Sequence, residues 1–163
     1  TWQGARTELP EFGLLFPLRR ELTEVSYLGL GPRETTADRT AGGKMGAWSY
    51  NVRQDFAQNT PVYPQECGSR TGVYRAAVTG SGLNIGIGFA GDSMTFSALP
   101  YTPHELENAR HLYELPRDDN KTVVRCAAFQ RGVGGDNSWG AKPHADDCFA
   151  VEKGTSFRFT IQK

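Results

Sequence analysis

The sequence has no excess of charge of either sign. Its 18 Lys and Arg residues balance 18 Asp and Glu residues over 163 residues. A protein that binds nucleic acid needs clustered positive charge to neutralise phosphates, so nucleic acid is not expected as a partner. No apolar run approaches the ~20 residues needed to cross a bilayer, so a role in the membrane is not expected either.

Cysteine is also scarce. The three cysteines are Cys67, Cys126 and Cys148, and no two of them form a C-x-x-C pair. An odd number at wide spacing argues against a disulfide framework and against a zinc site, which favours a reducing compartment such as the cytoplasm. The chain starts at Thr1 without Met or the charged region of a signal peptide, as expected for a stretch of a longer polypeptide.

Turn-forming residues, by contrast, are plentiful. The chain contains 19 Gly and 9 Pro residues, and 38% of its residues are hydrophobic. This balance favours short strands joined by many loops over a helical bundle. The length fits one domain spanning residues 1–163, which can bury roughly 70% of its unfolded surface without a metal or a disulfide.

Short apolar runs between turn residues predict antiparallel strands. A single short helix is expected to connect two of them, because Thr102, Pro103 and Glu105 form a capping-box pattern that starts a helix ending near Arg110. The predicted architecture is therefore all-β, an antiparallel β-sandwich with one short helix. The expected strands cover 13–18, 25–30, 47–52, 72–78, 83–89, 93–99, 111–115, 122–129 and 157–161, with 83–89 and 93–99 paired around a turn at 90–92.

Several motifs carry little functional weight. The glycines of 86–91 match G-x-G-x-x-G, but a dinucleotide site needs a helix after them, and 93–99 is predicted as a strand. The three histidines, His104, His111 and His144, are not spaced like metal ligands or like a nucleophile's base. We expect surface or structural roles for them, and no metal site in this chain.

Acidic residues cluster near arginines in two places. Arg39 follows Asp38, and Arg70 follows Glu66 after three residues. Pairs of this kind usually fix loops through bidentate contacts. They also lower the carboxylate pKa, which is the wrong direction for a general acid. Composition and spacing therefore nominate no catalytic pair.

The most unusual stretch is Gly132-Val-Gly-Gly-Asp-Asn-Ser-Trp139. Its glycines free the backbone, and they lead through three small polar residues to an indole. One interpretation is that Trp139 folds back and packs on the end of the sandwich. The other is that Trp139 forms an aromatic platform for the C–H face of a sugar.

Three ordered segments carry a resemblance to a known family. They are Tyr27-Leu-Gly-Leu-Gly-Pro-Arg-Glu34 continuing to Asp38-Arg39, then Pro64-Gln-Glu-Cys-Gly-Ser-Arg70, and the glycine-rich stretch that ends at Trp139. Segments 96–103 and 111–115 fall between the last two in the expected order. Together they resemble the small-chain domain of the large β-galactosidases of glycoside hydrolase family two, over about residues 9–162.

The resemblance implies the C-terminal portion of a galactose-mutarotase-like supersandwich. In that family the catalytic glutamates and the magnesium and sodium ligands lie in a separate (β/α)₈ barrel, so neither a catalytic residue nor a cofactor is expected in this chain, and the chain alone is expected to be inactive. The domain contributes a tryptophan to the aglycone side of the site, where the glucose of lactose stacks. That residue corresponds to Trp139, with Asp136, Asn137 and Ser138 as further substrate-binding residues.

The same resemblance implies loop-fixing and interface roles for Glu34, Asp38, Arg39, Glu66 and Arg70. The expected partners are the remaining domains of the parent β-galactosidase and a β-galactoside. Excised from such a parent, the domain would expose apolar surface and strand edges, so self-association is expected.

Two other functions stay open. A free-standing carbohydrate-binding sandwich would use Trp139 as its main platform and would bind galactosides without the parent. An enzyme resembling aldose epimerases would need a His acid and a carboxylate base, for which His111 and Glu114 are the local candidates.

Overall fold

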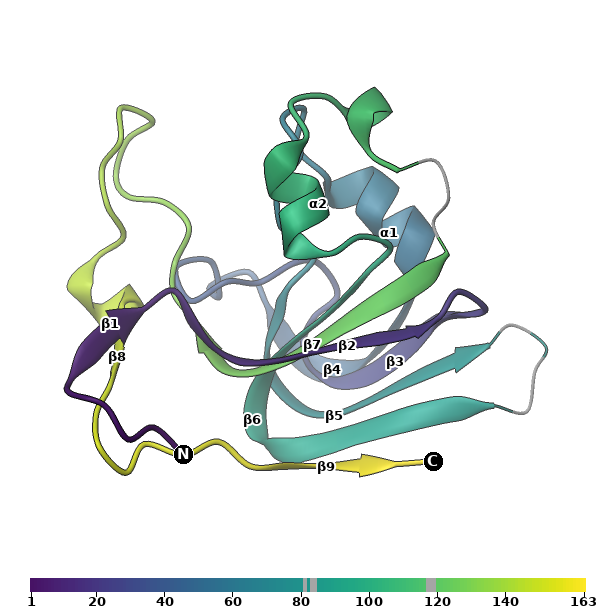
Figure 1. Ribbon diagram of the computed structural model, residues 1–163, viewed down its shortest axis with the longest axis horizontal. Coiled ribbons are helices and arrows are strands. Elements are labelled where there is room, and N and C mark those ends of the chain that lie inside the picture. The colour runs from purple at the N-terminus through teal and green to yellow at the C-terminus, as the bar shows by residue number, and fades with distance from the viewer. Residues whose placement is uncertain (81, 83–84, 117–119) are drawn as a thin grey trace.

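The computed structural model describes residues 1–80, 82, 85–116 and 120–163. Within them lie two α-helices and two short 3₁₀ helices, and the remaining regular structure is β-strand (Figure 1). The strands are β1 (Thr7–Leu9), β2 (Glu11–Arg19), β3 (Leu22–Gly31), β4 (Lys44–Asn51), β5 (Arg70–Gly80), β6 (Gly86–Leu99), β7 (Lys121–Gln130), β8 (Phe149–Val151) and β9 (Phe159–Gln162). The helices are α1 (Val52–Asn59), α2 (Pro103–Asn108), η1 (Leu112–Glu114) and η2 (Ala145–Asp147).

The strands form one large and one small antiparallel sheet. The large sheet has the order β2-β7-β6-β5-β3-β4, and β9 pairs with β6. The small sheet contains β1 and β8. The predicted all-β, antiparallel class is therefore confirmed.

The large sheet bends back on itself at β6. The first half of β6 pairs with β9, and its second half pairs with β7. Between the halves, Ser93 has a φ of 66°, a backbone conformation that sharply redirects a strand. The bend brings Phe16 of β2 against Phe89 of β6 and Phe159 of β9, with ring centroids 5.8 Å apart in each case. The sheet thus makes two layers around one core, as a sandwich does (Figure 1).

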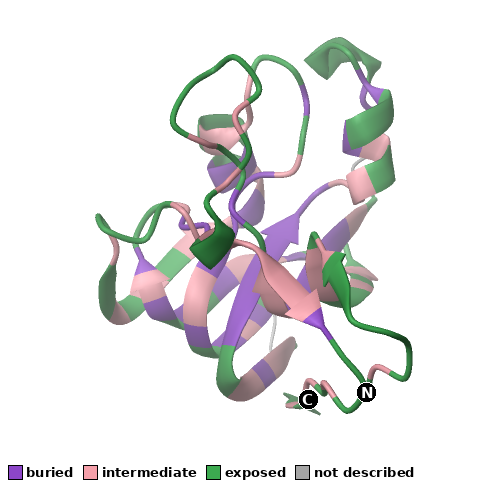
Figure 2. Ribbon diagram, turned by 90° about the vertical axis from the view of Figure 1, so that its left-hand side faces the viewer, coloured by how far each residue is buried: buried purple, intermediate pink, exposed green. Residues whose placement is uncertain are grey.

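The side chains of that core alternate along the strands. In β3, Val25 and Tyr27 are buried, while Ser26 between them and Leu28 beyond them are exposed. This is the period of two that one buried sheet face requires. Figure 2 shows the buried residues concentrated in the strands and the exposed ones in the loops at the ends. A second, smaller core lies under the helices and contains Phe56, Cys67, Leu99, Leu106, Ala109 and Leu115.

The helix after Thr102 is confirmed, including its cap. The Thr102 hydroxyl accepts from the Glu105 amide, and the Glu105 carboxylate accepts from the Thr102 amide at 2.7 Å. Pro103 stands at the first helical position, where its missing N–H costs nothing. The helix ends at Asn108, two residues earlier than expected.

Two sequence predictions were wrong, and one helix was missed. The hairpin around 90–92 does not form, because β6 runs through this segment without a turn. Residues 83 and 84 of the strand predicted at 83–89 lie outside the described residues. Residues 111–115 form the 3₁₀ turn η1 and its flanks instead of a strand. Helix α1 was not predicted, although Asn51 caps it by accepting from the amides of Arg53 and Gln54.

Among the described residues, no helix combines the length and the apolarity required to span a membrane.

Candidate functional site

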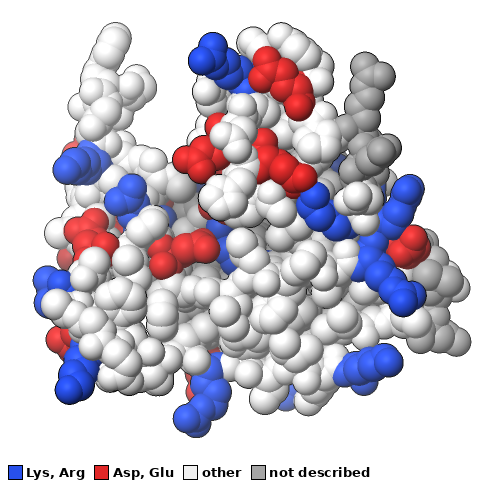
Figure 3. All heavy atoms as spheres, in the orientation of Figure 1, with Lys and Arg blue, Asp and Glu red and all other residues white. Residues whose placement is uncertain are grey.

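Trp139 lies at the end of a long loop that projects from the body of the molecule. We call residues 131–144, between β7 and η2, the Trp139 loop (Figure 1). The side chain of Trp139 is 91% exposed, so it does not fold back on the sandwich, and the packing interpretation is wrong for this chain. Figure 3 shows a hollow between the projecting loop and the segment around α2. Residues 137–141 at the end of the loop carry no charge.

The base of the loop is fastened to Asp38. One carboxylate oxygen of Asp38 accepts hydrogen bonds from the amides of Val133, at 3.1 Å, and Gly134, at 3.0 Å. The other accepts from the Thr36 hydroxyl at 2.6 Å. Burial tends to raise the pKa of Asp38, but the hydrogen bonds from Thr36, Gly134 and Val133 outweigh it and lower the pKa. Asp38 is therefore ionised at neutral pH and holds two consecutive amides of the loop.

Two glycines allow the chain to approach itself closely in this region. A Cβ on Gly132 would lie 2.9 Å from the Cβ of Asp38. A Cβ on Gly135 would lie 2.4 Å from the carbonyl oxygen of Lys142. Both distances are shorter than real Cβ contacts, so the two sides of the loop and its contact with Asp38 depend on glycine at these positions.

Three more hydrogen bonds shape the loop. The Gly132 amide donates to the Asp147 carbonyl at 2.9 Å. Further out, Asp136 Oδ1 and His144 Nε2 lie 2.8 Å apart. Next to the tip, Asn137 Oδ1 accepts from the Trp139 amide at 2.8 Å. All four residues of 136–139 are exposed. Asp136 and Asn137 make hydrogen bonds within the loop and so help to fix its conformation.

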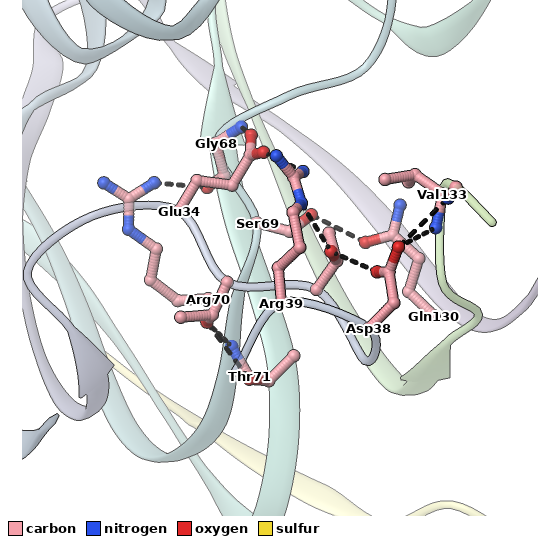
Figure 4. A network of polar contacts seen from close by, with 12 residues as sticks. Glu34, Asp38, Arg39, Gly68, Ser69, Arg70, Thr71, Gln130 and Val133 are labelled. Atoms are coloured by element: carbon pink, nitrogen blue, oxygen red, sulfur yellow. Dashed lines mark hydrogen bonds and ion pairs between the residues drawn. The ribbon is translucent and has the colours of Figure 1, made fainter. Parts of the chain in front are cut away.

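The segment that carries Asp38 is itself tied to the sheet (Figure 4). Arg39 donates through Nε to the Thr36 hydroxyl at 3.1 Å and forms an ion pair with Glu34. The Glu34 carboxylate also accepts from the amide of Gly68, two residues before β5. The predicted residues Glu34, Asp38 and Arg39 therefore belong to one connected network that reaches from β5 to the Trp139 loop.

Glu66 and Arg70, in contrast, do not pair with each other. Glu66 Oε1 lies 2.6 Å from Nη1 of Arg125, which also contacts Glu11 Oε2 at 2.8 Å. Burial is the largest influence on the pKa of Glu11 and raises it, against the opposing effect of Arg125. Arg70 pairs with Asp55 of α1. The sequence had suggested pairs of Arg39 with Asp38 and of Arg70 with Glu66. Both were wrong, because Arg39 pairs with Glu34 and Arg70 pairs with Asp55.

Asp55, Glu11 and Arg125 are site-supporting residues that the sequence did not single out. Arg125 is 1% exposed and donates to the Ser69 hydroxyl at 3.0 Å. The available signal was an arginine inside the apolar run of β7, because a buried guanidinium requires acidic partners. The sequence cannot indicate those partners when they lie 59 and 114 residues away.

A shallow groove follows the base of the Trp139 loop. Asp38, Arg39, Val133, Gly134, Gly135, Asp136, His144 and Asp147 line it. Its polar groups can donate to and accept from hydroxyls. In the described part of the chain, no three His, Cys, Asp or Glu side chains converge as metal ligands do.

The candidate acid and base of an epimerase are engaged elsewhere. The ring of His111 stacks on exposed Tyr113 with centroids 5.0 Å apart. The Glu114 carboxylate accepts from the Arg110 amide at 2.7 Å. Each group is thus held by its own neighbours along the chain.

Known proteins resemble this chain over nearly its whole length. A family described as "Beta galactosidase small chain" matches residues 1–161. The β-galactosidase of Lactobacillus delbrueckii subsp. bulgaricus is 40% identical over 94% of this chain and 15% of its own length. The β-galactosidase of Priestia megaterium is 38% identical over 95% of this chain and 15% of its own length.

One relative is a separate subunit. The β-galactosidase small subunit of Latilactobacillus sakei is 38% identical over 85% of this chain and 46% of its own length. The chain therefore spans less than half of a small subunit and about one seventh of the long β-galactosidases that it matches.

Proposed function

The chain belongs to the β-galactosidase small chain family, and from this we propose that it is a non-catalytic part of a β-galactosidase that shapes the aglycone side of the sugar site. The parent would be a retaining enzyme of glycoside hydrolase family two that acts in the cytoplasm on terminal β-D-galactosides such as lactose. The remaining domains of that enzyme would be the partners of this chain. Relatives that are themselves β-galactosidases support the parent activity.

The observation that carries this proposal is the exposure of Trp139 on a braced loop. An indole that is 91% exposed forgoes the burial that usually stabilises large aromatic side chains. Its flat apolar face suits the C–H face of a pyranose ring, while Asp136, Asn137 and Ser138 beside it offer polar groups for hydroxyls. Stacking there would orient the departing sugar, which is a positioning effect and involves no proton transfer.

Catalysis would come from elsewhere in the parent. Retaining glycosidases use two carboxyl groups about 5 Å apart, one with a raised pKa as the acid. In this chain Glu34 and Glu66 are ion-paired with arginines, and Asp38 accepts three hydrogen bonds that lower its pKa. These contacts favour structural roles. We therefore expect no turnover of a nitrophenyl β-galactoside by the isolated chain, and we assign magnesium and sodium to the parent's barrel.

The test replaces Trp139 by Ala and by Phe in the full-length parent. The Trp139→Ala variant should lose about 10- to 100-fold in kcat/KM for lactose, from removal of one stacking contact that positions the sugar. The loss for a nitrophenyl β-galactoside should be smaller, and Trp139→Phe should restore part of the lactose activity. Unchanged lactose kinetics in Trp139→Ala would reject the proposal.

A free-standing carbohydrate-binding module is the second candidate, and the exposure of Trp139 favours it as well. The two candidates differ in the isolated chain. A self-sufficient module would bind lactose, with a change in tryptophan fluorescence that Trp139→Ala removes. A domain that supplies one wall of a shared site would show no saturable change.

A further inference from the structure

We propose that Asp38 is the residue that positions Trp139 for the sugar, acting through the base of the Trp139 loop. This inference rests on the proposed function of Trp139 and adds a second residue to it. It also gives the Glu34–Arg39 segment a role, since that segment lies far from the loop in sequence and contacts it in the fold (Figure 4).

The contact has the geometry of a fixed attachment. A single oxygen of Asp38 accepts from two consecutive amides, Val133 and Gly134, across 95 and 96 residues of sequence. Two amides on one oxygen fix both the position and the direction in which the chain leaves the sheet. Because the acceptor is charged, these hydrogen bonds are stronger than neutral ones.

The attachment is continuous with the sheet. Asp38 is held by Thr36, whose hydroxyl accepts from Arg39, and Arg39 pairs with Glu34. The neighbouring Thr35 accepts through its hydroxyl from the Thr71 amide of β5 at 2.9 Å and donates its own amide to the Ser69 carbonyl. Thr35 and Thr36 are both 3% exposed, so the residues that hold Asp38 in place are themselves buried.

The other contacts of the loop cannot replace this one. The Asp136–His144 contact and the Asn137–Trp139 contact join parts of the loop to each other, so they move with it. The Arg131 amide donates to the Pro10 carbonyl and the Gly132 amide donates to the Asp147 carbonyl, each at 2.9 Å. Both bonds lie at or before Gly132 and leave the chain beyond it free to turn. Asp38 acts after Gly132, where the backbone becomes permissive.

The experiment is a double-mutant cycle in the full-length parent. Asp38→Ala should lower kcat/KM for lactose by about 3- to 30-fold, because a small displacement of a positioning group costs up to two orders of magnitude. Nitrophenyl β-galactoside kinetics should change less. In the Trp139→Ala background, Asp38→Ala should cause a much smaller further loss for lactose, since only the polar groups of Asp136, Asn137 and Ser138 are left on the loop to be positioned.

Two further variants complete the design. Asp38→Asn keeps an acceptor for the two amides and should recover part of the lost lactose activity. Asp92→Ala, at an exposed position of β6, is the matched control and should leave lactose kinetics unchanged. Lactose kinetics of Asp38→Ala equal to those of Asp92→Ala would overturn the inference. So would an equal loss with both substrates that persists in the Trp139→Ala background, because that result indicates a general structural role.

Amide hydrogen exchange separates this inference from the proposed function. In the intact parent, Asp38→Ala should accelerate exchange in a peptide that covers 132–140, whatever Trp139 does to lactose. If Trp139→Ala leaves lactose kinetics unchanged, the proposed function fails while faster exchange still supports positioning of the loop by Asp38. Unchanged exchange would reject that positioning.

Discussion

Arg70 and Asp55 form a buried bidentate ion pair that joins the start of β5 to helix α1. Nη2 of Arg70 lies 2.6 Å from Oδ1 of Asp55, and Nη1 lies 3.0 Å from Oδ2. Their side chains are 1% and 9% exposed. The guanidinium also lies 4.6 Å from the centroid of the Tyr50 ring. This pair holds α1 against the sheet beside the segment that leads to Asp38.

Removal of one member of this pair should destabilise the fold strongly. Asp55→Ala leaves a buried guanidinium without its counter-charge, and we expect a loss of about 3–5 kcal/mol in the free energy of unfolding. Urea denaturation of the chain would measure it. Asp92→Ala is the control and should change stability by less than about 0.5 kcal/mol. A loss for Asp55→Ala no larger than that of the control would show that the pair does not hold α1.

The His144–Asp136 contact should respond to pH. The hydrogen bond to Asp136, followed by its charge, raises the pKa of His144 above 6.5. A raised folded-state pKa means that the contribution of the contact is fully present below about pH 6.5 and is lost as the pH rises through the folded-state value. An NMR titration of the His144 ring should give a pKa that falls when Asp136 is replaced by Asn. An identical pKa in both proteins would exclude the contact in solution.

The edge strand β2 should drive self-association of the isolated chain. It ends the strand order of the large sheet, and Leu14 and Leu15 in its middle are 56% and 45% exposed. A long apolar edge offers free backbone groups for pairing, and a lysine there opposes it. Light scattering should therefore show a smaller mass for Leu14→Lys than for the unaltered chain. Val62→Lys, at a residue that is 92% exposed outside the strands, should leave the mass unchanged; a monomeric unaltered chain would contradict the prediction.

Local patterns in the sequence predicted most of the strands and the capped helix. The alternation in β3 and the Thr102–Glu105 box depend on near neighbours, so their signals survive without tertiary information. The hairpin predicted at 90–92 failed for the opposite reason. There the glycine-containing segment bends within one strand, and the partner strand adjusts through register shifts near Val73, which no local pattern reveals.

The same division applies to the candidate site. The glycine-rich run pointed to Trp139, and the acidic and basic clusters pointed to Asp38 and Arg70. The sequence could not show that Asp38 accepts from Val133 and Gly134, or that Arg70 pairs with Asp55, because these contacts depend on how the sheet folds. The sequence suggested ion pairs between residues close together in the chain, whereas the ion pairs that form join residues brought together by the fold.

The most direct measurement follows where the galactosyl group goes after the first step. If added glucose reacts with the galactosyl-enzyme of a retaining parent, the glucose must occupy the aglycone position, where we place Trp139. With a nitrophenyl β-galactoside as donor, the Trp139→Ala parent should transfer to glucose about 10-fold less efficiently than the unaltered enzyme, while hydrolysis by water persists. An unchanged ratio of transfer to hydrolysis would contradict the account and leave Trp139 without a role at the sugar site.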